Sequence, residues 1–275
     1  MRIGIIATGG DGRAGTSTSQ KMADRLVELG ATVEMIYPEA AAVSIDRLSP
    51  VHDLYVLKSS SEPALCYAAA LDAAGARMIN PYAAASAMKD KVITAKMLQS
   101  AGVPVPEAFI AAGASQLAEA VDSGPLVIKP YWAGSKGRGV QIVRDRRELA
   151  EVSVADGVVF AQRYHEPDGR DNKIYVIAGE VFGVSRVWPA RTHEDKLGQS
   201  LEVTSELKDI AERCGRAFRV DLFGVDIIFS KGRPLVVDIN SFPGFKGVAD
   251  ADRRLAEYIY RAAQEDVTTV VTSRQ

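Results

Sequence analysis

Two short apolar runs in the last quarter of the chain carry acidic and amide side chains. Residues 223–228 and 235–240 are rich in β-branched residues and are separated by turn residues, so they predict the two buried strands of a hairpin. Asp226 lies in the first run, whereas Asp238 and Asn240 lie in the second, two residues apart and therefore on one face. Burial of a carboxylate is costly unless it is paired or binds a metal. Mg²⁺ suits these oxygen ligands, and ion pairs with Arg or Lys are the equally open alternative at this point.

The composition limits the classes of protein to which the chain can belong. Its formal net charge of −2 over 275 residues argues against a nucleic-acid binder, a class that is strongly basic. Cys66 and Cys214 have no metal-ligand spacing and the three histidines are scattered, so we expect no zinc site and a reduced, cytoplasmic chain. The apolar start, residues 1–7, is too short for a signal peptide, and no run is long enough to span a membrane. We therefore expect a small-molecule substrate, no nucleic acid and no membrane as partners, and the oligomeric state stays open.

The pattern of apolar residues predicts three parts. Residues 1–84 alternate strand and helix, which is typical of a small parallel α/β sheet. A helix from about residue 84 to residue 101 follows, because Gly102, Pro104 and Pro106 form a normal helix stop. Residues 85–158 then read as a small α+β module with a hairpin. Residues 159–275 are rich in predicted strands and contain the acidic hairpin.

A lysine stands between a predicted strand and a glycine-rich loop. Lys129 ends the apolar run 125–128, where a charged side chain is costly unless it meets an anion. The glycines of residues 131–139 permit close backbone approach, and successive N–H groups in such loops form anion-binding nests. A phosphate site and a hairpin with a flexible tip both fit this segment, although the ending of a P-loop is missing. Another glycine-rich loop, residues 9–15, lacks Rossmann spacing, and we expect a turn at the sheet rim there.

The order of these motifs resembles the ATP-grasp superfamily. The likeness covers most of residues 85–265 and rests on the number, order and spacing of the motifs. They are Asp90-Lys91 with Lys96-Met97-Leu98, Gly102-Val103-Pro104 with Pro106, Val127-Ile128-Lys129-Pro130, residues 134–140, residues 161–164, Gly224-Val225-Asp226, and Asp238-Ile239-Asn240 with Pro243-Gly244. The resemblance implies an α/β fold of mixed type, in which a small parallel α/β pre-ATP-grasp domain precedes a two-subdomain ATP-grasp fold.

The resemblance also implies a nucleotide site, with ATP and two Mg²⁺ ions (or Mn²⁺) as cofactors. By similarity, the nucleotide-binding residues are Lys91, Lys129, Gly134, Ser135, Gly137, Gly139, Gln162, Arg163, Tyr164 and Lys173. Of these, Lys91 and Lys129 would contact the nucleotide phosphates, and residues 134–139 would close over the phosphates. Residues 162–164 would form the strand whose backbone reads adenine.

Catalytic and metal-binding roles follow from the same resemblance. Arg186 and Lys129 would be catalytic, with Arg186 stabilising charge on the transferred phosphoryl group. Asp226, Asp238 and Asn240 would hold the metal. The chain departs from the usual pattern at Arg163 and Asp238, where Glu is more common. Both changes are tolerable, because the adenine strand acts through its backbone and Asp remains an oxygen donor.

Two reactions stay open within this resemblance. Residues 134–140 have the glycine spacing of RimK-type glutamate ligases and glutathione synthase relatives, which implies a carboxylate–amine ligase that acts through an acyl phosphate on an amino acid or short peptide. Residues 222–228 and 238–248 also resemble inositol 1,3,4-trisphosphate 5/6-kinase, which phosphorylates a hydroxyl. The loop 189–199 lacks the Asn and paired Gly of a glutamate ligase. We expect a ligase, because the full glycine-rich loop is present, with the polyol kinase as the alternative.

Overall fold

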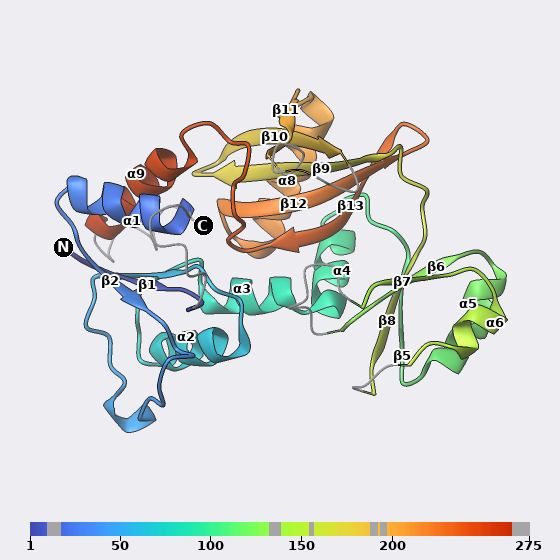
Figure 1. Ribbon diagram of the computed structural model, residues 1–275, viewed down its shortest axis with the longest axis horizontal. Helices are drawn as coiled ribbons and strands as arrows, with labels where there is room; N and C mark the ends of the chain where they lie inside the picture. Colours follow the sequence, from blue (N-terminus) through green and yellow to red (C-terminus); the bar gives the residue numbers. More distant parts are fainter. Residues whose placement is uncertain (10–17, 132–138, 154–156, 188–191, 193–196, 266–275) are drawn as a thin grey trace.

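The first sheet is parallel and has the strand order β2-β1-β3-β4 (Figure 1). The computed structural model describes residues 1–9, 18–131, 139–153, 157–187, 192 and 197–265. The strands of this sheet are β1 (Arg2–Ile6), β2 (Thr32–Ile36), β3 (Leu54–Leu57) and β4 (Met78–Ile79). The predicted α/β class is therefore confirmed for this part of the chain.

Helices cover both faces of the first sheet. Successive side chains of a strand point to opposite faces, so a strand with apolar residues at successive positions needs cover on both. Ile3 and Ile5 of β1 belong to a core with Leu255 and Ile259, whereas Ile6 packs in a separate cluster on the opposite face. The helices are α1 (Thr18–Glu28), α2 (Glu62–Ala73) and α9 (Ala251–Gln264). Helix α9 comes from the far end of the sequence and lies beside α1 (Figure 1). The predicted range 1–84 thus lacks one of the helices that cover its sheet.

The prediction of a single helix from about residue 84 to residue 101 is wrong, because the segment is divided. The structure has two helices there, α3 (Tyr82–Lys89) and α4 (Lys91–Ser100). Asp90 lies between them in an extended conformation, and its carboxylate accepts hydrogen bonds from the N–H groups of Val92 and Ile93, each at 2.9 Å. This side-chain cap satisfies free N–H groups at the start of α4, which favours a new helix over a continuous one.

The middle sheet is antiparallel and has the order β5-β8-β6-β7. Its strands are β5 (Ala108–Ala111), β6 (Leu126–Lys129), β7 (Gln141–Val143) and β8 (Val159–Arg163). The short helices η2 (Ala114–Leu117), α5 (Ala118–Asp122) and α6 (Arg146–Ala150) pack against it. Because β8 pairs with both β5 and β6, the boundary predicted between residues 158 and 159 divides this sheet. We propose a boundary after β8 instead.

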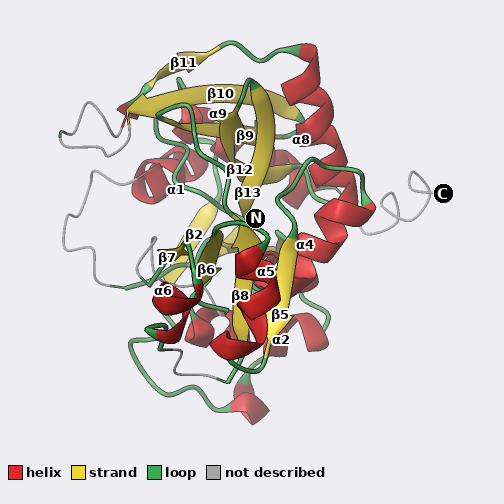
Figure 2. Ribbon diagram, turned by 90° about the vertical axis from the view of Figure 1, so that its right-hand side faces the viewer, coloured by secondary structure: helices red, strands yellow, loops and turns green. Residues whose placement is uncertain are grey.

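The third sheet has five antiparallel strands in the order β11-β10-β9-β12-β13 (Figure 2). They are β9 (Arg170–Ile177), β10 (Glu180–Val187), β11 (Gln199–Leu201), β12 (Leu222–Ser230) and β13 (Arg233–Asn240). Helix α8 (Ser205–Phe218) covers one face, where its Leu207 and Cys214 pack on Ile174 and Val225. The opposite face is left to polar side chains near the middle of the strands. No helix in the described part of the chain is long and apolar enough to cross a membrane.

Candidate functional site

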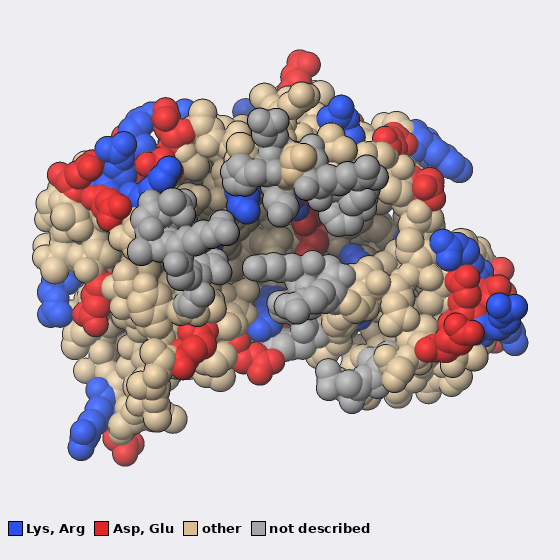
Figure 3. All heavy atoms as spheres, in the orientation of Figure 1, with Lys and Arg blue, Asp and Glu red and all other residues tan. Residues whose placement is uncertain are grey.

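One face of the third sheet gathers charged side chains from four adjacent strands. The face that α8 covers takes every second residue, so the intervening residues project to the other side. These are Asp171, Lys173 and Tyr175 of β9, Arg186 of β10, Asp226 of β12, and Asp238 and Asn240 of β13. We call this set the polar face. Figure 3 shows basic and acidic side chains in a hollow at the middle of the molecule.

The two predicted metal carboxylates lie directly opposite each other. Asp226 of β12 pairs with Asp238 of β13, and Asn240 pairs with Gly224 further along the hairpin. Asp226 also faces Lys173 of β9, whose Nζ donates to its Oδ1 at 2.7 Å. Burial raises the pKa of Asp226, against the opposing effect of the Lys173 charge. The carboxylate therefore gains from any cation that reaches it.

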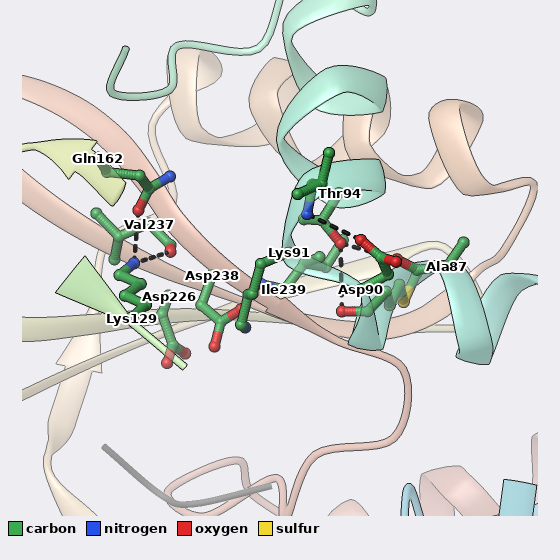
Figure 4. A network of polar contacts seen from close by, with 12 residues as sticks. Ala87, Asp90, Lys91, Thr94, Lys129, Gln162, Asp226, Val237, Asp238 and Ile239 are labelled. Carbon is green, nitrogen blue, oxygen red and sulfur yellow. Dashed lines mark hydrogen bonds and ion pairs between the residues drawn. The ribbon is translucent and has the colours of Figure 1, made fainter. Parts of the chain in front are cut away.

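Lysine side chains compensate both carboxylates in the structure. Burial is the largest single effect on the pKa of Lys173 and lowers it, but the charge and hydrogen bond of Asp226 together with the charge of Asp171, 3.5 Å from its Nζ, raise the pKa overall. Lys91, the first residue of α4, donates to the Oδ1 of Asp238 (Figure 4). The cap at Asp90 fixes the start of α4 and so places Lys91 over β13. The ion pairs that the sequence left open as an alternative are therefore present, and they do not exclude metal binding.

Lys129 reaches the same place from the middle sheet. Its Nζ donates to Oε1 of Gln162 at 2.6 Å and to the carbonyl of Val237 at 2.9 Å (Figure 4). Val237 is the extra residue of a β-bulge, since Asp226 pairs with Asp238 but Ile227 pairs with Val236. The bulge leaves its carbonyl outside the strand ladder and available to the lysine. Burial lowers the pKa of Lys129 to about 8, as expected for an ammonium group that no carboxylate pairs directly.

Arg186 projects from β10 on the polar face. Its NH2 group donates to the hydroxyl of Tyr175 at 2.7 Å and to the carbonyl of Lys246 at 3.1 Å. Its Nε is buried and has no hydrogen-bond partner among the described residues. A guanidinium held by two neutral acceptors, with one donor unused, is suited to bind an anion.

The predicted adenine strand is β8, and its side chains at positions 162 and 163 point in different directions. Gln162 is buried and accepts from Lys129, whereas Arg163 points away. The Arg163 guanidinium donates to the carbonyls of Ala120 and Gly124, at 2.8 and 2.5 Å, so its side chain supports the middle sheet. The N–H groups of Arg163 and Tyr164 already donate to backbone carbonyls of the neighbouring chain segments. A backbone contact of residues 162–164 with adenine therefore stays a prediction, and it is limited to their carbonyl groups.

Several predicted segments lie outside the described residues. Gly134, Ser135 and Gly137 are among them, as are most of the loops 9–15 and 189–199. Gly139 is described, with φ +79°, and a Cβ there would lie 3.0 Å from Pro130. Close to the start of the glycine-rich loop, the hydroxyl of Tyr131 donates to Oδ2 of Asp90 at 2.6 Å. The loop is thereby tied to the cap that positions Lys91.

Some residues of the site have no local signal in the sequence. The bulge at Val237 and the hydroxyl of Tyr175 beside Arg186 follow only from strand register. Asp171 joins the polar face because it lies two residues before Lys173 on β9. Asp90 did carry a signal, because Asp is a preferred N-cap residue.

The residues present fit Mg²⁺. Magnesium usually takes one or two carboxylates together with substrate phosphate oxygens, and Asp226 and Asp238 form such a pair, with the Asn240 amide on the same strand face. Both carboxylates are held by lysines that a divalent cation can displace. The surrounding lysines and Arg186 suit the phosphates that would complete the coordination.

Comparisons with known proteins point in one direction. A family model described as a RimK-like ATP-grasp domain matches residues 88–262. A ribosomal protein bS6–L-glutamate ligase of Escherichia fergusonii is 26% identical over 278 residues, covering 90% of each chain. A probable alpha-L-glutamate ligase of Parasynechococcus marenigrum is 25% identical over 66% of this chain, which spans 41% of that longer protein.

Solved structures share the fold. A RimK domain ATP-grasp protein from Sphaerobacter thermophilus superposes with a TM-score of 0.74 at 18% identity, covering 94% of this chain and 99% of that chain. The ATP-grasp ligase PsnB, complexed with a minimal precursor, superposes with a TM-score of 0.69 at 17% identity, covering 96% and 98%.

Proposed function

The chain belongs to the family of RimK-like ATP-grasp domains and is an ATP-dependent ligase, and we propose that it joins a carboxylate to an amine through an acyl phosphate. The observation that carries this proposal is the polar face. Two opposed carboxylates, Asp226 and Asp238, lie among Lys91, Lys173 and Arg186, which is an arrangement for polyphosphate with its metal. The described site residues include no Ser-His-Asp or Cys-His set, so catalysis would rest on positioning and charge neutralisation.

Mg²⁺ would be held by Asp226, Asp238 and Asn240, and it would neutralise charge on the phosphate oxygens of ATP. We infer that Lys91, which now pairs with Asp238, would donate to a nucleotide phosphate when that carboxylate holds the metal. Lys173 would keep Asp226 ionised until the metal binds.

Lys129 would exchange its two neutral acceptors for a phosphate oxygen. The exchange is favourable because burial already disfavours its charge, and an anion would restore it. Residues 134–139 would close over the phosphates and exclude water, which otherwise hydrolyses an acyl phosphate. The carbonyls of residues 162–164 would face adenine.

Arg186 would act on the transferred phosphoryl group. Its unused Nε donor is buried on the polar face, on the same side of the sheet as the metal carboxylates. A fixed guanidinium stabilises the charge that develops as the phosphoryl group moves to the substrate carboxylate. The amine then attacks the acyl phosphate, so that a C–N bond forms and inorganic phosphate leaves.

The substrate that we propose is an amino acid or short peptide. Relatives of the chain are named for ligation of L-glutamate, in one case to ribosomal protein bS6. The test incubates the protein with ATP, Mg²⁺, hydroxylamine and a panel of amino acids and peptides. A ligase converts the activated carboxylate to a hydroxamate and releases ADP. Release of ADP with inositol phosphates alone would support the polyol kinase instead.

A further inference from the structure

The junction between α3 and α4 contacts all three sheet-bearing parts of the molecule. Its three residues are more than nine-tenths buried, and they are Lys89, Asp90 and Lys91. Nζ of Lys89 donates to the carbonyl of Ser60, between β3 and α2, at 2.7 Å. Asp90 accepts from the hydroxyl of Tyr131, which closely follows β6 of the middle sheet, at 2.6 Å. Lys91 donates to Asp238 of the third sheet (Figure 4). The position of the junction therefore depends on all three parts.

Both oxygens of the Asp90 carboxylate are used. Oδ1 accepts from the N–H groups of Val92 and Ile93 and so caps α4, whereas Oδ2 accepts from the Tyr131 hydroxyl. This hydrogen bond raises the pKa of Tyr131, so the hydroxyl stays protonated and remains the donor at neutral pH. A buried carboxylate oxygen that loses its donor is costly, and the carboxylate would turn away from the cap to regain one. The hydroxyl of Tyr131 therefore fixes the orientation of the group that starts α4.

The same hydrogen bond joins the two segments that carry the predicted phosphate lysines. Tyr131 lies two residues after Lys129 in the sequence, and Asp90 directly precedes Lys91. The two segments belong to different hydrophobic cores, because side chains of α4 pack with the third sheet whereas β6 contributes to the core of the middle sheet. The Tyr131–Asp90 bond therefore holds the start of α4 against the end of β6 across the boundary between these cores.

Nucleotide binding would leave this hydrogen bond in place. In the nucleotide-free protein the side chains of Lys91 and Lys129 both donate to groups of β13, which also ties them to the third sheet. In the proposed site both lysines donate to phosphate oxygens instead. We propose that Tyr131 is the positioning residue for Lys91, because its hydroxyl, acting through Asp90, fixes the backbone from which this lysine reaches a phosphate. The inference rests on the proposed nucleotide site.

The experiment measures the Kd for ATP with Mg²⁺ by calorimetry, in a double-mutant cycle of Tyr131→Phe and Lys91→Met. We expect Tyr131→Phe alone to raise the Kd about 5- to 20-fold, because Lys91 loses its fixed position. Lys91→Met alone should raise the Kd at least as much. In the Lys91→Met background, Tyr131→Phe should change the Kd by less than about twofold, because the lysine through which it acts is absent. Tyr258→Phe on α9 is the matched control, since it also removes a hydroxyl that donates to a carboxylate, that of Asp221, and the Kd should stay within about twofold.

An unchanged Kd in Tyr131→Phe, whatever urea unfolding shows for its stability, would overturn the proposal and leave the hydroxyl a structural role. Equal fold-changes in Kd for Tyr131→Phe with and without Lys91 would also overturn it, since the hydroxyl would then act independently of the lysine. An unchanged Kd in Lys91→Met would do the same. None of these measurements requires turnover, so failure of the hydroxamate assay would count against the ligase reaction and not against the role of Tyr131.

Discussion

Arg163 should contribute to the stability of the middle sheet and little to nucleotide binding through its side chain. Its guanidinium donates to the carbonyls of Ala120 and Gly124 and lies 5.3 Å from the centre of the Phe109 ring. Its ion pair with Glu107 is 3.3 Å long, and the Glu107 side chain is 63% exposed, so that pair contributes little. Arg163→Ala removes all of these contacts at once.

The magnitude follows from these contacts. A hydrogen bond to a charged group is worth about 1.5–3 kcal/mol, and a cation–π contact at a partly exposed site about 0.5–1 kcal/mol. Two bonds and one ring contact would give roughly 3.5–7 kcal/mol if they were independent and fully buried. The two carbonyls regain part of this by turning to water, so we expect a loss of about 2–4 kcal/mol of unfolding free energy.

Urea unfolding followed by circular dichroism measures the loss, and calorimetry at low temperature measures the Kd for ATP. We expect the Kd of Arg163→Ala to stay within about twofold, since the predicted adenine contact uses backbone carbonyls. Arg163→Lys should recover only part of the stability, because one ammonium group cannot reproduce the fork that spans both carbonyls. Arg146→Ala, which breaks an exposed ion pair with Asp122 in the same module, is the control and should have little effect. Unchanged stability, or a large rise in Kd without a stability loss, would refute this reasoning.

Three further outcomes are expected. Asp238→Asn should abolish Mg²⁺-dependent ADP release while circular dichroism shows an intact fold; normal turnover at limiting Mg²⁺ would contradict the metal assignment. Lys129→Met should raise the Kd for ATP at least about tenfold. The stability of the nucleotide-free protein should change by less than about 1 kcal/mol, because the loss of two hydrogen bonds is offset by the removal of a buried charge. An unchanged Kd in calorimetry would count against the contact of Lys129 with phosphate. At pH 8, Ellman's reagent should label the exposed Cys66 quickly, whereas Cys214, whose pKa burial raises to about 12, should react only after unfolding; two fast thiols would disprove this.

The local patterns predicted much of the site, because its main features lie within short stretches of sequence. Alternating apolar residues placed Asp226 and Asp238 on neighbouring strands of a hairpin, and the structure pairs them directly. Strict alternation of strand and helix likewise predicted the first parallel sheet. Asp90 also carries a local signal, since an Asp inside an apparent helix can cap a second one.

Other features depend on contacts between distant segments, which short-range patterns do not contain. No local signal marks the bulge at Val237, whose carbonyl receives Lys129 from another sheet. The side chain of Arg163 turns away because Ala120 and Gly124, about forty residues earlier, offer two carbonyls at the right spacing. The assignment of β8 to the middle sheet likewise required knowledge of its partners β5 and β6.

The position of α9 has a consequence for how the polypeptide folds during synthesis. Leu255 and Ile259 complete the core over β1 and β3, strands that the ribosome makes about 250 and about 200 residues earlier. Until α9 emerges, one face of that first sheet exposes aliphatic side chains that chaperones recognise and that favour aggregation. The amino-terminal sheet is therefore among the first parts to be synthesised and among the last to be finished, and truncation before residue 251 should harm the beginning of the chain more than its end.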